Sequence, residues 1–115
     1  MPGLEDWYHV RFDEQVFRRE VAPPGGESWS DQVPWRDIVR VCYMTRDALE
    51  SDELYVFCSS RPESYVIPME ADGGLALLNE LVRRELFPAQ LAIEAAGSNG
   101  ALYCWPPAGP NSESA

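Results

Sequence analysis

The chain alternates between short apolar runs and polar stretches rich in proline or glycine, a pattern typical of short antiparallel strands. Bulky and polar residues alternate over residues 7–13 and again over 16–21, which predicts a first hairpin. The run Pro23-Pro24-Gly25-Gly26 then breaks regular structure, because proline lacks an amide donor and glycine loses the most entropy on ordering. We therefore expect a loop over residues 22–32.

The strongest strand signal lies between residues 33 and 44, where apolar side chains occupy both faces of an extended chain. Such a strand is expected inside a sheet, covered on both sides. Two further strands are predicted over residues 54–59 and 65–69, with a turn at 61–64 between them. Acidic residues crowd the stretch 45–53, which predicts a solvated loop.

Leucines recur at helical spacing after residue 72, which predicts an amphipathic helix over residues 73–87. Asp72 is expected to cap its first amides, and Pro88 ends it. A short second helix is predicted over 88–96, a final strand over 101–105 and a disordered tail over 106–115, outside a single globular domain of residues 1–105. The expected apolar stripe of the first helix consists of Leu75, Leu77, Leu78, Leu81, Val82 and Leu86.

Together these elements predict an α+β fold. We expect a twisted antiparallel sheet of about five or six strands with the amphipathic helix packed across its open face. A half-open barrel is the expected form, and a flat two-layer sandwich is the alternative.

The balance of charges narrows the classes of partner. Nineteen acidic residues oppose nine basic ones, all of them arginine, for a net charge of −10. Such a surface repels nucleic acid and anionic lipid headgroups, so neither is expected as a partner. Solubility alone explains this charge, and the sharper interpretation is that the surface meets a basic protein. No apolar run reaches the roughly 18 residues of a membrane helix, and the first residues lack a secretion signal, so a cytoplasmic protein is expected.

Catalytic and metal-binding signatures are not evident in the pattern. Cys42, Cys58 and Cys104 lie in apolar strand-like runs and are expected to be free, buried residues without metal-ligand spacing. His9 is the single histidine and has no nucleophile motif to serve, so it is expected to be a partly exposed strand residue. Neither glycine pair precedes a lysine, so no phosphate loop and no cofactor are predicted.

Binding chemistry is therefore the better-supported expectation. Four tryptophans and five tyrosines occur in the chain, and aromatic residues with arginine dominate binding hot spots. The candidate binding residues are Trp29, in the predicted Pro/Gly loop, and the loop acids Asp47, Glu50, Asp52 and Glu53.

Short motifs along residues 8–105 resemble those of a family of short, uncharacterised bacterial proteins with a W-x-D-I strand and a terminal C-W. They are Val10–Glu14, Val33–Ile38, Thr45–Asp47, Asp52–Phe57, Tyr65–Pro68, the leucine helix and Ser98–Trp105. The insertion at 22–32 departs from that pattern, as does Tyr55 where tryptophan is expected. The resemblance implies no activity and no site residues. More distantly, strands followed by a packing helix resemble bacterial pleckstrin-homology-like modules.

Three functions fit these observations. The first is a non-enzymatic protein-interaction module, and the second is an immunity-type protein that neutralises a basic toxin. The third is a small enzyme that uses Asp47 and Asp52 with Arg46 or Arg61. The apolar strand over 101–105 could also pair with a second copy of the chain.

Overall fold

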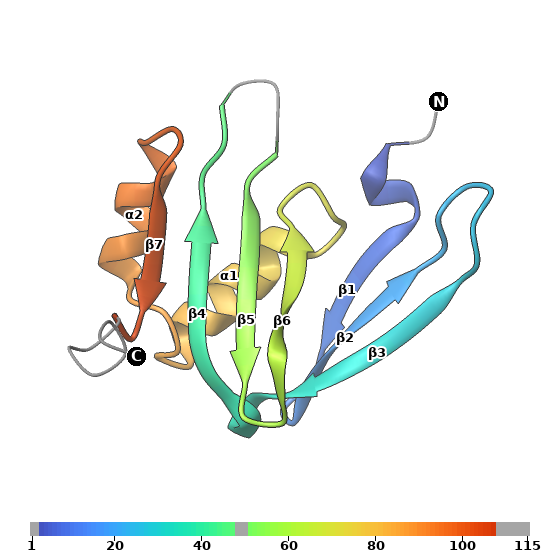
Figure 1. Ribbon diagram of the computed structural model, residues 1–115, viewed down its shortest axis with the longest axis horizontal. Coiled ribbons are helices and arrows are strands. Elements are labelled where there is room, and N and C mark those ends of the chain that lie inside the picture. The colour runs from blue at the N-terminus through green and yellow to red at the C-terminus, as the bar shows by residue number, and fades with distance from the viewer. Residues whose placement is uncertain (1–2, 48–50, 108–115) are drawn as a thin grey trace.

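The computed structural model describes residues 3–47 and 51–107, whose seven strands form two antiparallel sheets. The first sheet has the order β1 (Tyr8–Phe12), β2 (Val16–Val21), β3 (Trp29–Pro34). The second has the order β6 (Arg61–Pro68), β5 (Glu53–Cys58), β4 (Ile38–Met44), β7 (Leu102–Trp105). Helices α1 (Gly74–Arg83) and α2 (Ala89–Ala96) lie on one face of the four-stranded sheet, and the three-stranded sheet splays away from it (Figure 1).

The α+β class and the antiparallel pairing are confirmed, but the strands are divided between two sheets that do not close into a barrel. The division arises at a short 3-10 helix, Trp35–Asp37, that separates β3 from β4. The indole of Trp35 is buried and donates from Nε1 to the carbonyl oxygen of Asp13 at 2.9 Å. This anchor turns the chain out of the first ladder, so that Ile38 begins a new one.

Strand boundaries differ from the prediction mainly between β5 and β6. Residues 61–64, predicted as a turn, belong to β6, and the chain reverses at residues 59 and 60 instead. The predicted tail lies outside the described residues from position 108 onward.

A single apolar core joins both sheets to α1. Leu77, Leu78 and Leu81 of α1 are buried in it, whereas Leu75, expected in the same stripe, is 61% exposed. The helix ends at Arg83 instead of residue 87, because Glu85 adopts a left-handed backbone with φ of 62°. The fully buried apolar side chains are Phe17, Val33, Val41, Leu54, Val56, Ile67, Leu77, Leu81 and Phe87.

The entry to α1 is fastened to β1. Gly73 has φ of 91°, and a Cβ there would lie 2.3 Å from the carbonyl oxygen of Val10, so only glycine fits. Asp72 does not cap the helix as predicted. Its carboxylate instead accepts hydrogen bonds from His9 Nδ1 and Arg11 Nη2, both at 2.8 Å. These bonds lower the pKa of Asp72.

Arg19 on β2 connects the two sheets, although it is only 8% exposed. Its Nε and Nη2 atoms donate to the carboxylate of Asp31 on β3 at 2.9 and 2.5 Å. Its Nη1 atom donates to the carbonyl oxygen of Val66 on β6 at 3.0 Å and to the Tyr8 hydroxyl at 3.2 Å. Burial opposes the charge of the guanidinium, but these partners raise the pKa of Arg19 on balance. The cation stays charged at the junction between the sheets.

Two cysteines form a bond that the sequence did not predict. Cys42 on β4 and Cys104 on β7 face each other in register and are joined by a disulfide, so they are not free thiols. Cys58 is free and buried as predicted. An odd number of cysteines does not exclude this bond, because one cross-strand disulfide needs only the pair that the sheet brings together.

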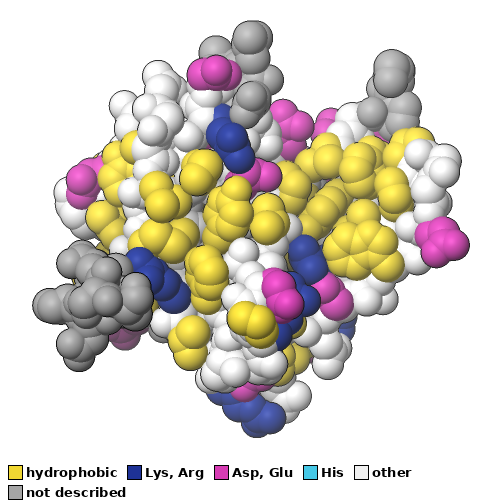
Figure 2. Space-filling view, viewed as in Figure 1, with side chains coloured by type: hydrophobic (Ala, Val, Ile, Leu, Met, Phe, Trp, Pro, Cys, Tyr) yellow, Lys and Arg dark blue, Asp and Glu magenta, His cyan; other side chains and the backbone are white. Residues whose placement is uncertain are grey.

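The face of the four-stranded sheet opposite the helices carries an apolar row. Cys104, Cys42, Tyr55 and Val66 follow one another across its strands in register. Apolar side chains gather on this face in Figure 2, which is viewed from the side opposite the helices. It is therefore not a polar outer face of the kind that a two-layer fold usually shows.

Replacing Arg19 tests the connection between the sheets. Arg19→Met removes both donors from the Asp31 carboxylate and leaves the Val66 carbonyl with the Tyr8 hydroxyl alone, so we expect a loss of about 3 kcal/mol in the free energy of unfolding. Arg18→Met is the matched control, because Arg18 forms an exposed pair with Asp13 and should cost less than about 1 kcal/mol. Urea denaturation of both variants measures the difference, and equal losses would contradict the role of Arg19.

Thiol labelling tests the disulfide. In denaturant without reductant, a maleimide should label one cysteine, Cys58, and after reduction it should label all three cysteines of the chain. The Cys58→Ser variant should take no label until it is reduced. Labelling of Cys42 or Cys104 in the unreduced protein would show that the bond does not form.

Candidate functional site

Sheet edges are the places where this fold can pair with another chain, and three of its four edges are protected. The edge of β1 is bonded to the segment before α1: Val10 N–H donates to the Asp72 carbonyl, and Asp72 N–H donates to the Tyr8 carbonyl. The edge of β6 is engaged by Arg19 and by the Tyr8 hydroxyl, which both donate to Val66. The edge of β7 is four residues long and runs into two prolines, Pro106 and Pro107.

The fourth edge is the six-residue strand β3, which has no neighbouring strand on its outer side in the part of the chain that the structure describes. Residues of an antiparallel pair alternate between those that exchange hydrogen bonds and those that do not. Trp35 N–H donates to the Gln15 carbonyl at 3.1 Å, which continues the β2–β3 register. The bonded positions of β3 are therefore 33, 31 and 29, and the N–H and C=O groups of Ser30 and Gln32 point away from β2. Among the described residues, no backbone or side-chain group bonds to them.

The first hairpin supports the same assignment. Asp13 N–H donates to the Val16 carbonyl at 3.0 Å, so positions 16, 18 and 20 of β2 bond to β1. Positions 17, 19 and 21 are then left to bond β3, as the Trp35 contact requires. We call the outward side of Ser30 and Gln32 the β3 edge.

The prediction of a loop through residue 32 is wrong, because β3 begins at Trp29. The sequence pattern did not indicate this strand, because proline and glycine residues precede it and most of its own residues are polar. A signal was present nonetheless: Trp29, Asp31 and Val33 alternate with Ser30, Gln32 and Pro34. Arg19 likewise stands between Phe17 and Val21 on one face of β2. Its positive charge is therefore paired across the two strands with the negative charge of Asp31, and both lie within otherwise apolar faces.

Trp29, the aromatic candidate from the sequence, stands at the start of the β3 edge. Its side chain is 43% exposed, and its ring meets Tyr8 edge-on at 6.4 Å between centroids. The Arg19 guanidinium lies 4.9 Å from the centroid of the indole. The ring is therefore held in place from within while much of its surface stays open to solvent.

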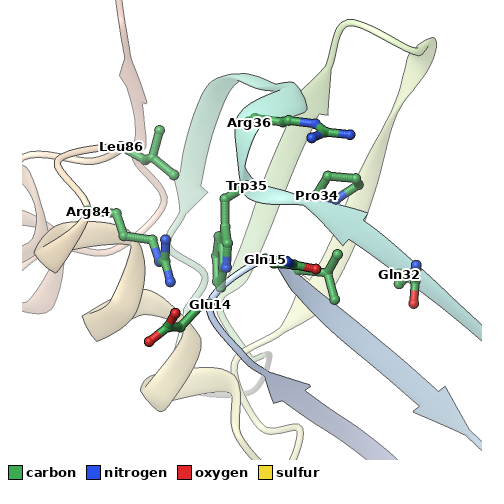
Figure 3. A pocket seen from close by; sticks show the side chains of 9 residues that line it. Glu14, Gln15, Gln32, Pro34, Trp35, Arg36, Arg84 and Leu86 are labelled. Atoms are coloured by element: carbon green, nitrogen blue, oxygen red, sulfur yellow. The ribbon is translucent and has the colours of Figure 1, made fainter.

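A groove lies at the Pro34 end of the β3 edge. We call it the Trp35 groove; it has a volume of about 670 Å³. The Arg84 guanidinium packs over the Trp35 ring at 4.3 Å from its centroid, and Arg36 points away from Arg84 on the side of Pro34 (Figure 3). No ion-pair partner of Arg36 occurs among the residues that the structure describes. The lining residues are Glu14, Gln15, Val16, Gln32, Pro34, Trp35, Arg36, Arg84 and Leu86.

A smaller hollow lies at the opposite end of the same strand. We call it the Trp29 hollow; it has a volume of about 310 Å³. His9 lines it and is partly exposed, as predicted, with its Nδ1 atom bonded to Asp72. The lining residues are His9, Glu20, Val21, Ala22, Ser28, Trp29 and Ser30. The β3 edge thus runs from one concave surface to another.

The acidic candidates lie elsewhere, at the start of β5, and they bond mainly within their own loop. Asp52 accepts hydrogen bonds from the Tyr43 hydroxyl and the Arg46 amide at 2.8 and 2.9 Å. Glu53 accepts from Arg46 at 2.6 Å and from the Tyr55 hydroxyl at 2.9 Å. Burial and the nearby Asp52 carboxylate raise the pKa of Tyr43.

The other loop candidates are Asp47, which also takes part in an interaction, and Glu50, which lies outside the described residues. Arg61 stacks over Tyr65 at 3.6 Å and donates to two main-chain carbonyls. Among the described residues, Trp29 contacts Tyr8 and Arg19 and not the acidic loop.

Comparisons of the chain with protein families, curated proteins and solved structures found no match. Within residues 3–47 and 51–107, no group of three or more histidine, cysteine or acidic side chains is arranged to hold a metal ion. Over the same residues, no helix has the length and apolar composition needed to cross a membrane.

Arg84, which lines the Trp35 groove, donates to Glu80, and this ion pair predicts a pH dependence of stability. Hydrogen bonds from Arg83 and Arg84 lower the pKa of Glu80 from 4.5 to about 2. A folded-state pKa below the unfolded value means that these bonds stabilise the fold above pH 4.5 and lose that effect as the pH falls toward 2. Glu80→Gln should therefore flatten the loss of stability in this window, measured by urea denaturation at several pH values. The control Glu94→Gln changes an exposed acid of α2 and should leave the profile unchanged; an unchanged profile for Glu80→Gln would contradict the prediction.

Proposed function

We propose that the protein is a non-enzymatic protein-binding module that takes up an extended segment of its partner as an additional strand beside β3. The observation that carries this proposal is the β3 edge, where Ser30 and Gln32 present main-chain groups outward that have no partner among the described residues. Main-chain hydrogen bonds give such a complex its affinity, and alternate side chains give it specificity.

The dimensions of the edge fit this role. A strand of six residues spans about 20 Å, and an added segment of similar length would extend from the Trp29 hollow to the Trp35 groove. Both concave surfaces can then receive side chains from the ends of the segment. Trp29 supplies an exposed aromatic ring at one end, which is typical of a binding hot spot.

The chain itself is poorly suited to fill this edge with a second copy. Each copy carries a net charge of −10, and Asp31 stands in the middle of the strand. In the symmetric pairing that places Ser30 opposite Gln32, Asp31 would face its own counterpart, and like charges directly opposite each other are destabilising. Native sheets use such inward charges against self-pairing. An immunity-type role, with a basic toxin as partner, is the specific form of this function that the negative charge favours.

A proline at the outward amide tests the proposal. Gln32→Pro removes an outward N–H without removing a hydrogen bond to β2, so the fold should persist while strand addition is blocked. Gln32→Ala is the matched control, because it keeps the amide. We expect a partner captured from the native host by the wild-type protein to be retained by the alanine variant and lost from the proline variant. In the wild-type complex, hydrogen exchange should slow at the Ser30 and Gln32 amides.

Two results would contradict this function. One is a proline variant that is folded, as judged by its circular dichroism and melting curve, and still captures the same partner. The other is a complex in which the Ser30 and Gln32 amides exchange as fast as in the free protein.

A further inference from the structure

The side chains beside the β3 edge indicate which type of side chain the added segment carries opposite Asp31. In a β-ladder, the residue directly opposite Asp31 would stand on the same face as Asp31, with Trp29 and Val33 as its diagonal neighbours. That position lies on the side of the sheet where Arg19 connects the two sheets.

Asp31 can accept more than it does at present. Its two carboxylate oxygens each take one hydrogen bond from Arg19, and each has a further lone pair. The Asp31 side chain is 30% exposed, so a donor on a neighbouring strand can reach it. The exposed part of the Trp29 indole lies two residues away on the same face and offers a π surface to a cation.

Two further acids lie toward the Trp29 end of the strand. Glu27 lies in the loop that leads into β3, and Glu20 lines the Trp29 hollow from the face of the sheet opposite to that of Asp31. Neither has an ion-pair partner among the residues that the structure describes. Arg36 lies at the opposite end, in the Trp35 groove. The Trp29 half of the β3 edge therefore favours a positive side chain.

We propose that the added segment is an extended strand with a lysine or arginine opposite Asp31, whose charged group contacts the Asp31 carboxylate and the Trp29 ring. This inference rests on the proposed strand addition and names the chemistry of the partner. It requires a basic residue at one position of a strand, which is more specific than a basic partner in general.

Three synthetic peptides test it. Each is a capped heptapeptide of alternating threonine and valine whose central residue is lysine, norleucine or glutamate. Nuclear magnetic resonance titrations of the isotope-labelled protein would follow the amides of Ser30 and Gln32 and the indole N–H of Trp29. We expect the lysine peptide to bind about fivefold more tightly than the norleucine peptide, with a preference that decreases as salt is added.

Variants locate the preference. Trp29→Leu should reduce the lysine preference about threefold, whereas Glu63→Gln, which removes an exposed acid from β6, should leave it unchanged. Asp31→Asn should abolish the preference. Because Asp31 also accepts the hydrogen bonds of Arg19, the melting curve of Asp31→Asn must first show that this variant is folded. If it is not folded, the result with Trp29→Leu decides whether the lysine preference arises at this position.

Different failures separate the two proposals. If the norleucine or glutamate peptide binds as tightly as the lysine peptide or more tightly, with shifts at Ser30 and Gln32, the inference of a basic residue is overturned. The proposal of strand addition would then still hold. Absence of shifts at those two amides with all three peptides would overturn strand addition and this inference with it. Concentration-dependent shifts at the same amides without peptide would identify a second copy as the occupant and overturn the inference.

Discussion

The buried guanidinium of Arg19 determines how the two halves of this fold meet. The two sheets share no ladder, so their relative placement depends on the common core and on the few polar groups that cross the junction. Arg19 crosses it with every one of its nitrogens bonded, to Asp31 on its own sheet, to Val66 on the other and to Tyr8. A buried cation with such a partner set is not a large net source of stability, but it tolerates few alternative arrangements. Its bonds therefore limit the ways in which the two sheets can meet.

The same arrangement explains why β3 differs from the other edges. Tyr8 and Arg19 both donate to the Val66 carbonyl oxygen on the β6 edge, and the segment before α1 pairs with β1. Both contacts lie on the side where the sheets face each other. β3 lies at the outer margin of the three-stranded sheet (Figure 1) and has no neighbour there among the described residues. Its openness follows from the topology and not from a local irregularity of the strand.

Local periodicity was enough to predict most strands, both helices and the α+β class, because each of those elements repeats its apolar residues at its own period. It failed where a polar residue occupies a buried position. Asp31 and Arg19 interrupt apolar faces, and only their pairing across β2 and β3 makes the interruption favourable. Local periodicity also could not predict which distant residues pair. Cys42 meets Cys104, and Asp72 meets His9, only because the fold brings their segments side by side. Of the candidate binding residues, Trp29 lies at the open edge, whereas Asp52 and Glu53 bond within their loop.

The disulfide makes the stability of this chain depend on the redox state of its surroundings. It closes a loop of 62 residues, and a link of that span lowers the entropy of the unfolded chain by an amount equivalent to about 4 kcal/mol. That is a large share of the roughly 5–15 kcal/mol by which a domain is ordinarily stable. In a reducing compartment the bond would open, and the four-residue β7 would be held by its ladder with β4 and by the hydrogen bonds between Thr45 and Ala101. The same sequence would then exist in an oxidised form and a less stable reduced form, which differ by a two-electron reduction of the disulfide.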